Sequence, residues 1–316
     1  MPLFNTCFYN TRALVANFFM VLDDSERDST SVLRRHEQLL RRCRSLNDAL
    51  DLIPSIICDP QSRDSDLVSI VGQTKCGLNI FILNRLAESC YYIPGYLDHS
   101  RAVDLVDEIL NDMIDSPPNS SSLDPAKVHK DLWKGYLKDP NDLSCSLNKL
   151  RWSCVGFHYN WGQRSYNKSE WSRFPKSFEN LYSSVLNDIN HTRQGDPLSG
   201  NPESAIINFY HAHRISDRLG GHRDDVEETD SSPLVSLSFG RSGIFLIEDQ
   251  VICLRSGDVL VMAEKARQSL HGVPVVFPLA KRKQEHDSDC SDRSWRASVE
   301  EFLHNTRISI SIRQVY

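Results

Sequence analysis

The chain has 316 residues, of which 40% are hydrophobic and 25% are charged, a composition that is ordinary for a soluble globular protein. The formal net charge of −6 argues against a protein that binds nucleic acid over its whole surface, so nucleic-acid binding would need a local basic patch. The length allows one large domain, or one domain with an extension. No apolar run is long enough to span a membrane. The nine cysteines include no CxxC pair, which is typical of reduced thiols in an intracellular protein.

The first 22 residues contain Arg12 and no acidic side chain. A mitochondrial transit peptide is poor in acidic residues, but it is also rich in arginine and amphipathic, and this segment meets only the first condition well. A frayed or partly helical N-terminus explains the segment equally well.

Leucines recur near helical spacing from Ser31 to Ile53 and predict a helix that Pro54 ends. Five arginines lie on its other face: Arg34, Arg35, Arg41, Arg42 and Arg44. They form either a ridge that contacts phosphates or a solvated face, and a solvated face is the commoner fate of such runs. We assign residues 1–76 to an N-terminal helical extension and residues 77–316 to the main domain.

The middle of the chain alternates short strands with helices. We predict a strand at Leu78–Leu83, a helix at Tyr96–Ile114, a loop at residues 116–122, a strand at Arg151–Asn160 and a helix at Phe174–Ile189. Strict alternation in Arg151–Asn160 places Val155, Phe157 and Tyr159 on one face of that strand.

The C-terminal half is rich in strands. Seven are predicted: Ala205–Tyr210, Leu234–Phe239, Gly243–Glu248, Val251–Leu254, Val259–Met262, Ser269–Val276 and Arg307–Val315. The segment Leu279–Ser298 is charged and poor in apolar residues, so we expect a surface loop there. Its basic cluster, Lys281-Arg282-Lys283, either contacts phosphate or only adds solubilising charge. The fold class is therefore α+β.

The sequence His222-Arg223-Asp224 follows a pair of glycines after the first of these strands. Alternation places the imidazole and the carboxylate on the same face of an extended segment, where both can bind one metal ion. With a second histidine they would form the two-histidine, one-carboxylate triad of non-haem Fe(II) oxygenases. His271, inside the predicted strand Ser269–Val276, is the strongest candidate. His286 lies in the charged segment and His304 on a predicted helix, and H-x-D alone also occurs by chance on solvated turns.

The last strand, TRISISIRQVY, alternates strictly between apolar and polar residues. Its polar face carries Arg307, Ser309, Ser311 and Arg313. Guanidinium groups inside a protein need partners, and a dicarboxylate co-substrate would supply them because arginine binds carboxylates through two parallel hydrogen bonds. An edge strand with a solvated polar face is the alternative.

Together these motifs resemble the AlkB-type Fe(II)- and 2-oxoglutarate-dependent dioxygenases, most closely the branch of animal AlkB homologue 1. The resemblance runs from about Asp131 to the C-terminus. It rests on N-x-Y at Asn208 and Tyr210, HxD at His222, PLVSLSFG at Pro233, SGIFLI at Ser242, SGD at Ser256, H-x-V-P at His271, R-x₅-R-Q-V at Arg307 and KLRWSCVGFHYNW at Lys149.

The resemblance implies a double-stranded β-helix, or jelly-roll, core at about residues 150–316. It implies that His222, Asp224 and His271 bind Fe(II), and that 2-oxoglutarate and O₂ are co-substrates. Arg307 would pair with the distal carboxylate of 2-oxoglutarate, Asn208 and Tyr210 would donate hydrogen bonds, and Arg313 would lie near the keto-acid end or brace the metal site. The family pattern R-x-N-x-T-x-R is here R-x-S-x-S-x-R, so Ser309 lacks an amide that could contact the co-substrate.

The resemblance also assigns a substrate side. Trp133 would lie near the substrate, and Phe157, His158, Tyr159 and Asn160 would line its pocket. Aromatic rings with polar tips can stack on a flipped or single-stranded base and bond its edge. Alternatively, Trp133 is a core residue on a short helix, and Phe157 and Tyr159 belong to a cluster that closes the barrel.

The function expected from these features is oxidative demethylation or hydroxylation of methylated bases. The candidates are tRNA carrying 1-methyladenine or 5-methylcytosine and DNA carrying N6-methyladenine, with a role in DNA repair among the possibilities. A histone or other protein demethylase, and a catalytically weak nucleic-acid-binding module of the same fold, are the alternatives. We expect a monomer with no membrane partner. By resemblance we expect an intracellular protein in mitochondria, the nucleus or both, and the cytoplasm is the alternative.

Overall fold

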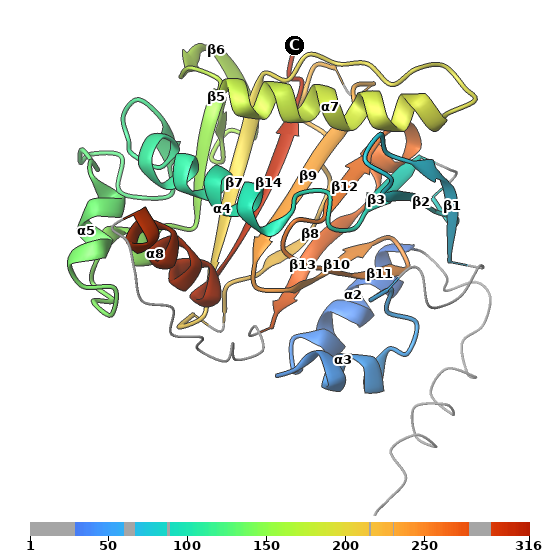
Figure 1. The fold of residues 1–316 in the computed structure, drawn as a ribbon, viewed down its shortest axis with the longest axis horizontal. Coiled ribbons are helices and arrows are strands. Elements are labelled where there is room, and N and C mark those ends of the chain that lie inside the picture. The colour runs from blue at the N-terminus through green and yellow to red at the C-terminus, as the bar shows by residue number, and fades with distance from the viewer. Residues whose placement is uncertain (1–28, 60–66, 87–88, 215, 230, 278–291) are drawn as a thin grey trace, which may run out of the picture.

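Two antiparallel β-sheets form the centre of the protein, with helices on their outer sides (Figure 1). The computed structural model describes residues 29–59, 67–86, 89–214, 216–229, 231–277 and 292–316. The transit-peptide prediction for residues 1–22, the Lys281–Lys283 cluster and His286 lie outside the described residues.

The larger sheet has ten strands. Its order is β1 (Val68–Gln73), β2 (Asn79–Leu83), β3 (Cys90–Ile93), β12 (Val259–Met262), β9 (Leu234–Gly240), β14 (Thr306–Arg313), β7 (Ser204–His211), β5 (Trp152–Asn160) and β4 (Ser120–Ser121), with β6 (Ser165–Trp171) paired to β5. The C-terminal strand β14 is therefore central, antiparallel to β7 on one side and to β9 on the other.

The smaller sheet has four strands, in the order β11 (Gln250–Leu254), β10 (Gly243–Ile247), β13 (His271–Val276) and β8 (Leu219–His222). Apolar residues of the two sheets pack in one cluster between them, with Leu234 and Met262 from the larger sheet and Phe245 and Val273 from the smaller. The predicted α+β jelly-roll architecture is confirmed, because two antiparallel sheets enclose one interior.

Alternation along β14 divides its side chains between two environments. Ile308, Ile310 and Ile312 are fully buried in the core on the outer face of the larger sheet. The helices α4 (His99–Glu108), α7 (Lys176–Thr192) and α8 (Asp292–Asn305) and the π-helical turn η2 (Ile109–Met113) cover this face (Figure 1). The polar residues of β14 therefore point between the sheets, as the sequence predicts.

The single helix predicted at Ser31–Ile53 is wrong, because the structure has two helices, α2 (Ser29–Leu40) and α3 (Leu46–Leu52). Ser45 starts the second helix through a capping box: its hydroxyl accepts from the Asp48 amide, and the Asp48 carboxylate accepts from the Ser45 amide. This local cap competes with helix continuation, which leucine spacing alone does not reveal. Four of the five arginines, all but the half-buried Arg35, are exposed.

The bounds of a predicted loop and of a predicted helix also differ from those in the structure. The loop predicted at Leu279–Ser298 is wrong from residue 292 onward, since α8 begins at Asp292; residues 278–291 are outside the described part. The helix predicted from Tyr96 begins only at His99, because the Asp98 carboxylate caps it by accepting from the Arg101 amide. The proposed division at residues 76 and 77 stays a prediction; β1 and β2 pair across that point.

Two further observations concern the described residues only. The seven cysteines among them form no disulfide bond. No helix in the described ranges combines the length and the apolar character needed to cross a membrane.

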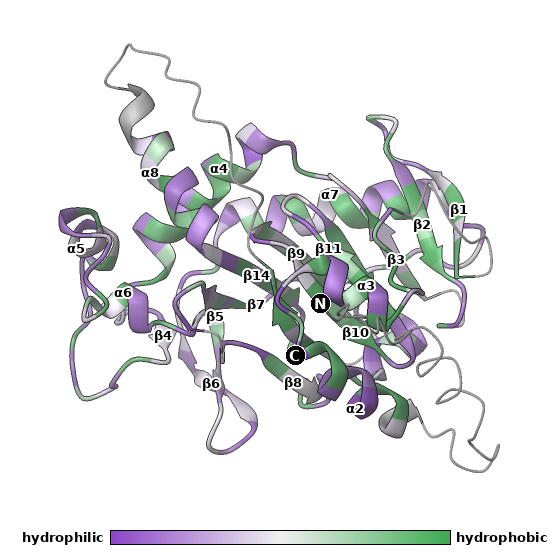
Figure 2. Cartoon of the chain, turned by 90° about the horizontal axis from the view of Figure 1, so that it is seen from below, coloured by the Kyte–Doolittle hydropathy of each residue, from purple (hydrophilic) through white to green (hydrophobic). Residues whose placement is uncertain are grey.

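Helix α2 packs against the smaller sheet and lies beside β8 (Figure 2). Leu33 and Leu40 are fully buried there with Ile244 and Leu246 of β10. We expect Leu33→Ala to lower the free energy of unfolding by about 2–5 kcal/mol, because it removes buried methyl groups and leaves a cavity. Urea denaturation measures the change. Gln38→Ala, on the exposed side of the same helix, is the control and should change stability by less than about 0.5 kcal/mol.

Candidate metal and co-substrate site

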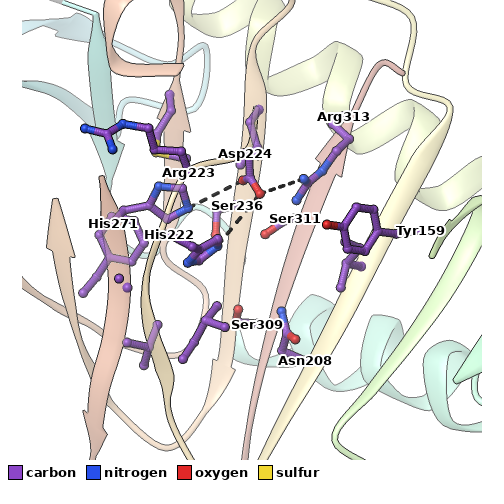
Figure 3. Close-up of a pocket in the computed structure, with 18 of the residues that line it drawn as sticks. Tyr159, Asn208, His222, Arg223, Asp224, Ser236, His271, Ser309, Ser311 and Arg313 are labelled. Carbon is purple, nitrogen blue, oxygen red and sulfur yellow. Dashed lines mark ion pairs between the residues drawn. The ribbon is translucent and has the colours of Figure 1, made fainter. Parts of the chain in front are cut away.

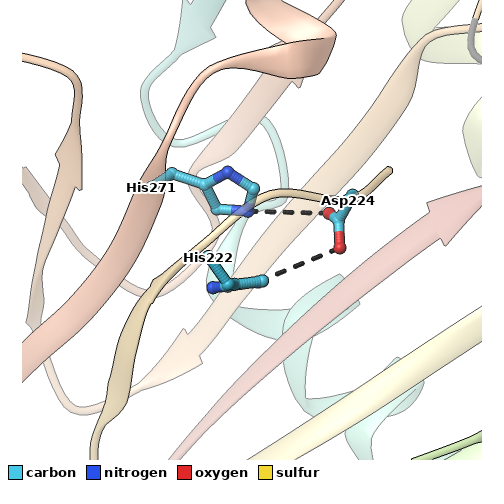
Figure 4. Close-up of side chains that lie close together, drawn as sticks. All are labelled: His222, Asp224 and His271. Carbon is cyan, nitrogen blue, oxygen red and sulfur yellow. Dashed lines mark ion pairs between the residues drawn. The ribbon is translucent and has the colours of Figure 1, made fainter. Parts of the chain in front are cut away.

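Three predicted metal ligands meet at one edge of the smaller sheet. His222 ends β8, and it lies directly opposite His271, the first residue of β13. Asp224 follows β8, with carboxylate oxygens 3.9 Å from His222 Nε2 and 3.5 Å from His271 Nε2 (Figure 4). One ligand atom from each residue lies within 4.8 Å of the others. This spacing allows all three to bind one ion.

Backbone carbonyls fix the orientation of both imidazole rings. His222 Nδ1 lies 3.0 Å from the Gly220 carbonyl, and His271 Nδ1 lies 2.9 Å from the Ser269 carbonyl. Because a carbonyl only accepts hydrogen bonds, each Nδ1 carries the proton and each Nε2 keeps its lone pair for a metal. Burial, with His271 nearby, lowers the pKa of His222 to about 4, so this ligand is neutral at neutral pH.

The carboxylate of Asp224 is held in its charged form. Burial raises its pKa, but Arg313 at 3.0 Å and His271 outweigh burial and leave the pKa well below its usual range. Two imidazoles and one anionic carboxylate suit Fe(II). The residues present therefore fit the ion that the sequence predicts. His304 is exposed on α8 and does not belong to this cluster.

The triad opens into a cavity of about 440 Å³ between the two sheets. Figure 3 shows residues from both sheets pointing into it. The larger sheet contributes Asn208, Ser236, Arg307, Ser309, Ser311 and Arg313, all of which line the cavity. The polar face of β14 therefore shares one cavity with the metal ligands, as the alternation predicts.

Arg307 is 1% exposed, and its guanidinium donates to uncharged groups only. Nη1 donates to the carbonyls of Arg241 (3.0 Å) and Leu254 (3.2 Å), and Nη2 donates to the Ser238 hydroxyl (2.8 Å). Among the described residues, none forms an ion pair with it. Burying an unpaired charge is costly, so a carboxylate ligand entering the cavity would be stabilised here.

Arg313 differs because the protein already supplies its partners. Its Nη1 lies 3.0 Å from Asp224 Oδ1 and 2.8 Å from Glu227 Oε1. Arg313 is therefore placed to brace the carboxylate of Asp224, which corresponds to one of the two roles that the resemblance implied for it.

The N-x-Y pair lies on β7, beside β14. Asn208 is the cross-strand partner of Ser309 and lines the cavity. Tyr210 is opposite Arg307 and is buried, though it does not reach the cavity wall. Burial raises the pKa of Tyr210 to about 12, so its hydroxyl stays protonated and can donate a hydrogen bond.

Residues 89–313 match the family model described as the 2OG-Fe(II) oxygenase superfamily. The chain belongs to this superfamily. The match covers the whole region between β3 and the last residue of β14, and so includes every residue of the metal triad and of the polar face of β14. It confirms the predicted family and the cofactors that it implies: Fe(II), 2-oxoglutarate and O₂.

Several curated proteins are similar to this 2OG-Fe(II) oxygenase. The Arabidopsis thaliana DNA N(6)-methyladenine demethylase ALKBH1A is 32% identical over 66% of this chain and 64% of its own length. The human nucleic acid dioxygenase ALKBH1 is 29% identical over 71% of this chain and 62% of its own. The tRNA demethylase abh1 of Schizosaccharomyces pombe is 25% identical over 89% of this chain and 95% of its own length. The chain thus spans just under two thirds of the first two relatives. The predicted AlkB resemblance is confirmed.

The predicted substrate residues are only partly gathered at the cavity of this oxygenase. Tyr159 lines it. Phe157 packs edge-on against Tyr316, His158 bonds Ser172, and Asn160 accepts from the Gln163 amide. Trp133 lies on α5 (Leu132–Lys138), near α6 (Ser146–Lys149), in the outer core, stacked on Tyr136 at 5.3 Å. Trp133 is therefore a core residue on a short helix, which was the alternative interpretation of the sequence.

Strict alternation in β5 is wrong, because Gly156 has a φ of +75° and the register with β6 shifts between Phe157 and Tyr159. Val155 packs in the outer core, whereas Tyr159 lines the cavity between the sheets. A bulge of this kind re-aims the side chains that follow it. A Cβ at Gly156 would lie 2.1 Å from the Glu203 carbonyl oxygen, so the position requires glycine.

Several cavity residues were missed by the sequence predictions. Trp161, Arg164, Arg223 and Ser236 line the cavity without belonging to any predicted site. The only sequence signal for Trp161 is its place at the end of the aromatic run KLRWSCVGFHYNW. Arg164 lies in a turn and Arg223 in the irregular segment after β8, where no periodic pattern shows which way a side chain points.

Gly243 of β10 provides the space that Arg307 occupies. A Cβ at this position would lie 2.8 Å from Arg307 Nε and 3.0 Å from its Cδ. Because the Arg307 side chain is buried, it cannot move away freely, and overpacking of this kind costs about 1–3 kcal/mol. We expect Gly243→Ala to raise the KM for 2-oxoglutarate roughly tenfold while metal binding stays normal. Gly135→Ala is the control for general effects on folding, because Gly135 is exposed on α5 and no atom lies within 4 Å of the added Cβ.

Proposed function

We propose that this chain is an Fe(II)- and 2-oxoglutarate-dependent dioxygenase that oxidises methyl groups on nucleic-acid bases. One observation supports the chemistry above all. The His222–Asp224–His271 cluster opens into the same cavity as the buried guanidinium of Arg307, which no described carboxylate pairs. A metal triad needs open positions for its co-substrates, and a buried cation needs an anion, so a 2-oxoglutarate molecule would satisfy both.

Each residue has a distinct role in this proposal. Bound iron, with 2-oxoglutarate and O₂, would supply the oxidation of a methyl C–H bond. His222, Asp224 and His271 hold the ion, and Arg313 keeps the Asp224 carboxylate oriented and charged. Arg307 binds the distal carboxylate of the co-substrate through its two-pronged guanidinium. Asn208, which lines the cavity, donates a further hydrogen bond to the co-substrate.

The cavity mouth suits a planar base. Tyr159 and Trp161 pack at right angles with ring centroids 4.8 Å apart, and both line the cavity. Trp161 is 45% exposed, so it offers an aromatic surface to solvent beside the metal site. Base–aromatic stacking is the usual means of holding a single-stranded or flipped base. The relatives named as nucleic acid dioxygenases and tRNA or DNA demethylases support the same substrate class.

A panel of substrates tests this proposal. The purified chain is incubated with Fe(II), 2-oxoglutarate and O₂ together with methylated tRNA, 1-methyladenine or 5-methylcytosine RNA, N6-methyladenine DNA, or methyl-lysine histone peptides. Mass spectrometry follows each substrate, and succinate and formaldehyde are measured alongside. We expect oxidation of at least one nucleic acid, with equivalent succinate. Oxidation of the peptides alone would identify a protein demethylase, and no succinate with any substrate would identify a binding module of the same fold.

The proposed substrates also suggest where the protein works. DNA and tRNA are both present in the nucleus and in mitochondria, so we propose one or both compartments, with the protein acting as a monomer on DNA or tRNA. Fractionation of cells that express a tagged chain, and light scattering of the pure protein, test these two statements separately.

We expect Trp161→Ala to raise the KM for an oligonucleotide by about tenfold or more, because stacking of one base on an aromatic ring is worth about 1–3 kcal/mol. The KM for 2-oxoglutarate should not change, since Trp161 lies at the mouth and not beside Arg307. Trp295→Ala is the control, because Trp295 is also exposed but lies on α8, on the outer side of the protein. Equal effects of the two changes would contradict a specific stacking role.

A further inference from the structure

Asp224 lies just beyond regular secondary structure, although it carries the metal-binding carboxylate. Strand β8 ends at His222, and residues 223–226 belong to no strand or helix. A main chain without ladder hydrogen bonds is free to shift unless other groups hold it. The position of this ligand therefore depends on side chains that reach it from elsewhere.

Arg267 contacts the main chain of Asp224. This residue lies on the 3₁₀ turn η3 (Glu264–Gln268), is 1% exposed and does not line the cavity. Its Nη1 donates to the Asp224 carbonyl oxygen at 3.1 Å, and its Nε donates to the Ser232 carbonyl oxygen at 3.2 Å. Its Nη2 forms an ion pair with Glu227 Oε2 at 3.3 Å.

Glu227 connects Arg267, through Arg313, to the side-chain carboxylate of Asp224. Its side chain is fully buried between two guanidinium groups, with Oε2 facing Arg267 and Oε1 accepting from Arg313 Nη1 at 2.8 Å. The same Nη1 lies 3.0 Å from Asp224 Oδ1 (Figure 3). Burial raises the pKa of Glu227, but Arg313 and Arg267 outweigh burial and lower it, so this carboxylate is charged.

The contacts form a closed ring that starts and ends at Asp224. The ring runs from the Asp224 carboxylate through Arg313, Glu227 and Arg267 back to the Asp224 carbonyl. Two carboxylates balance two guanidinium groups, so the ring is neutral before any ligand binds. A buried charge whose partner is removed is costly, which means that each member of the ring keeps the others in place.

We propose that Glu227 and Arg267 are positioning residues for the metal site, which fix the main chain and the carboxylate of Asp224 together. This inference rests on the proposed metal site. Neither residue touches the metal position or the cavity. They act through Arg313 and through the backbone, so that Asp224 Oδ2 faces His271 while Oδ1 is held by Arg313 on the side of His222.

Titration of the metal-free full-length chain with Mn²⁺, followed by electron paramagnetic resonance, tests this role without any turnover. Glu227→Gln keeps the shape and removes the charge, so Arg313 would pair with Asp224 alone and compete with the metal. Arg267→Met removes the bond to the Asp224 carbonyl. We expect each change to weaken Mn²⁺ binding about 10- to 100-fold, the usual effect of losing a group that orients a ligand. Because the four residues of the ring act as a unit, the double variant should bind Mn²⁺ only slightly more weakly than the single variant with the lower affinity.

Two comparisons separate positioning from general stability. Asp188→Asn neutralises another buried carboxylate, on α7, which accepts from Tyr96 and from the Lys75 amide. It should lower the thermal midpoint and leave Mn²⁺ affinity unchanged. Arg267→Lys keeps the positive charge if Arg267→Met does not fold, and it should show an intermediate affinity. The proposal would be overturned if Glu227→Gln and either Arg267 variant bound Mn²⁺ with wild-type affinity. It would also be overturned if the losses of affinity multiplied in the double variant. If the wild-type chain itself binds no Mn²⁺, the metal site is wrong as well.

Discussion

Replacing Asp224 by alanine is expected to abolish the formation of succinate and formaldehyde. The change removes the only anionic ligand of the triad and also leaves the buried guanidinium of Arg313 without one of its two partners. We expect turnover to fall roughly a thousandfold or more, which corresponds to about 4 kcal/mol. His222→Ala should act in the same way, because it removes a neutral ligand whose Nε2 faces the same point. Succinate and formaldehyde are measured with the substrate found in the panel.

Glu228→Ala is the matched control for Asp224→Ala. Glu228 is an exposed carboxylate four residues further along the chain, and its side chain has only a distant ion pair with Lys168 at 3.8 Å among the contacts described. Exposed pairs of this kind are worth little, so turnover should remain near that of the unchanged protein. Normal turnover in Asp224→Ala or His222→Ala would refute the metal assignment.

Replacing Arg307 by methionine is expected to separate co-substrate binding from metal binding. The variant loses the buried two-pronged donor, so we expect the KM for 2-oxoglutarate to rise about 100-fold, equivalent to about 3 kcal/mol. Mn²⁺ binding without 2-oxoglutarate should be normal, because Arg307 contacts no metal ligand.

Arg313→Met provides the contrast, because Arg313 is paired with Asp224. It should weaken Mn²⁺ binding even when no 2-oxoglutarate is present. Titrations of both variants with Mn²⁺ and then with 2-oxoglutarate distinguish the two roles. An unchanged KM for 2-oxoglutarate in Arg307→Met would show that the distal carboxylate binds elsewhere.

Ser309 stands where the family pattern has an asparagine, and its position in the structure shows what this difference changes. Ser309 lies between Asn208 on β7 and Ser238 on β9, and it lines the cavity beside Arg307. Where the family pattern has an amide, a shorter hydroxyl leaves room for a water molecule to bridge the gap. Ser236 and Ser311 also line the cavity, so it keeps several hydroxyl groups even without that amide.

The parts of the site that the sequence reveals are those with a regular period. Alternation along β14 separates Ile308, Ile310 and Ile312 from the four polar residues because a strand has two faces and only one is covered by helices. The HxD motif has the same origin, since His222 and Asp224 are two residues apart on an extended segment. His271 could be paired with them only by the resemblance and by its place at a strand.

The parts that the sequence does not reveal depend on contacts between distant, irregular segments. Glu227 and Arg267 lie in a loop and in a 3₁₀ turn, where spacing does not show that their charges will meet inside the protein. The positive φ of Gly156 and the register shift after Phe157 change the face of Tyr159, and no repeat in β5 signals them. The division between α2 and α3 comes from a local cap at Ser45. In each case a local contact or backbone conformation overrides the hydrophobic pattern.

A crystal structure of the chain grown with Mn²⁺ and 2-oxoglutarate would test the central claim most directly. The account predicts an anomalous density peak bound by His222 Nε2, one carboxylate oxygen of Asp224 and His271 Nε2, with the far carboxylate of 2-oxoglutarate on Arg307. A peak elsewhere, or 2-oxoglutarate bound away from the β14 arginines, would contradict it.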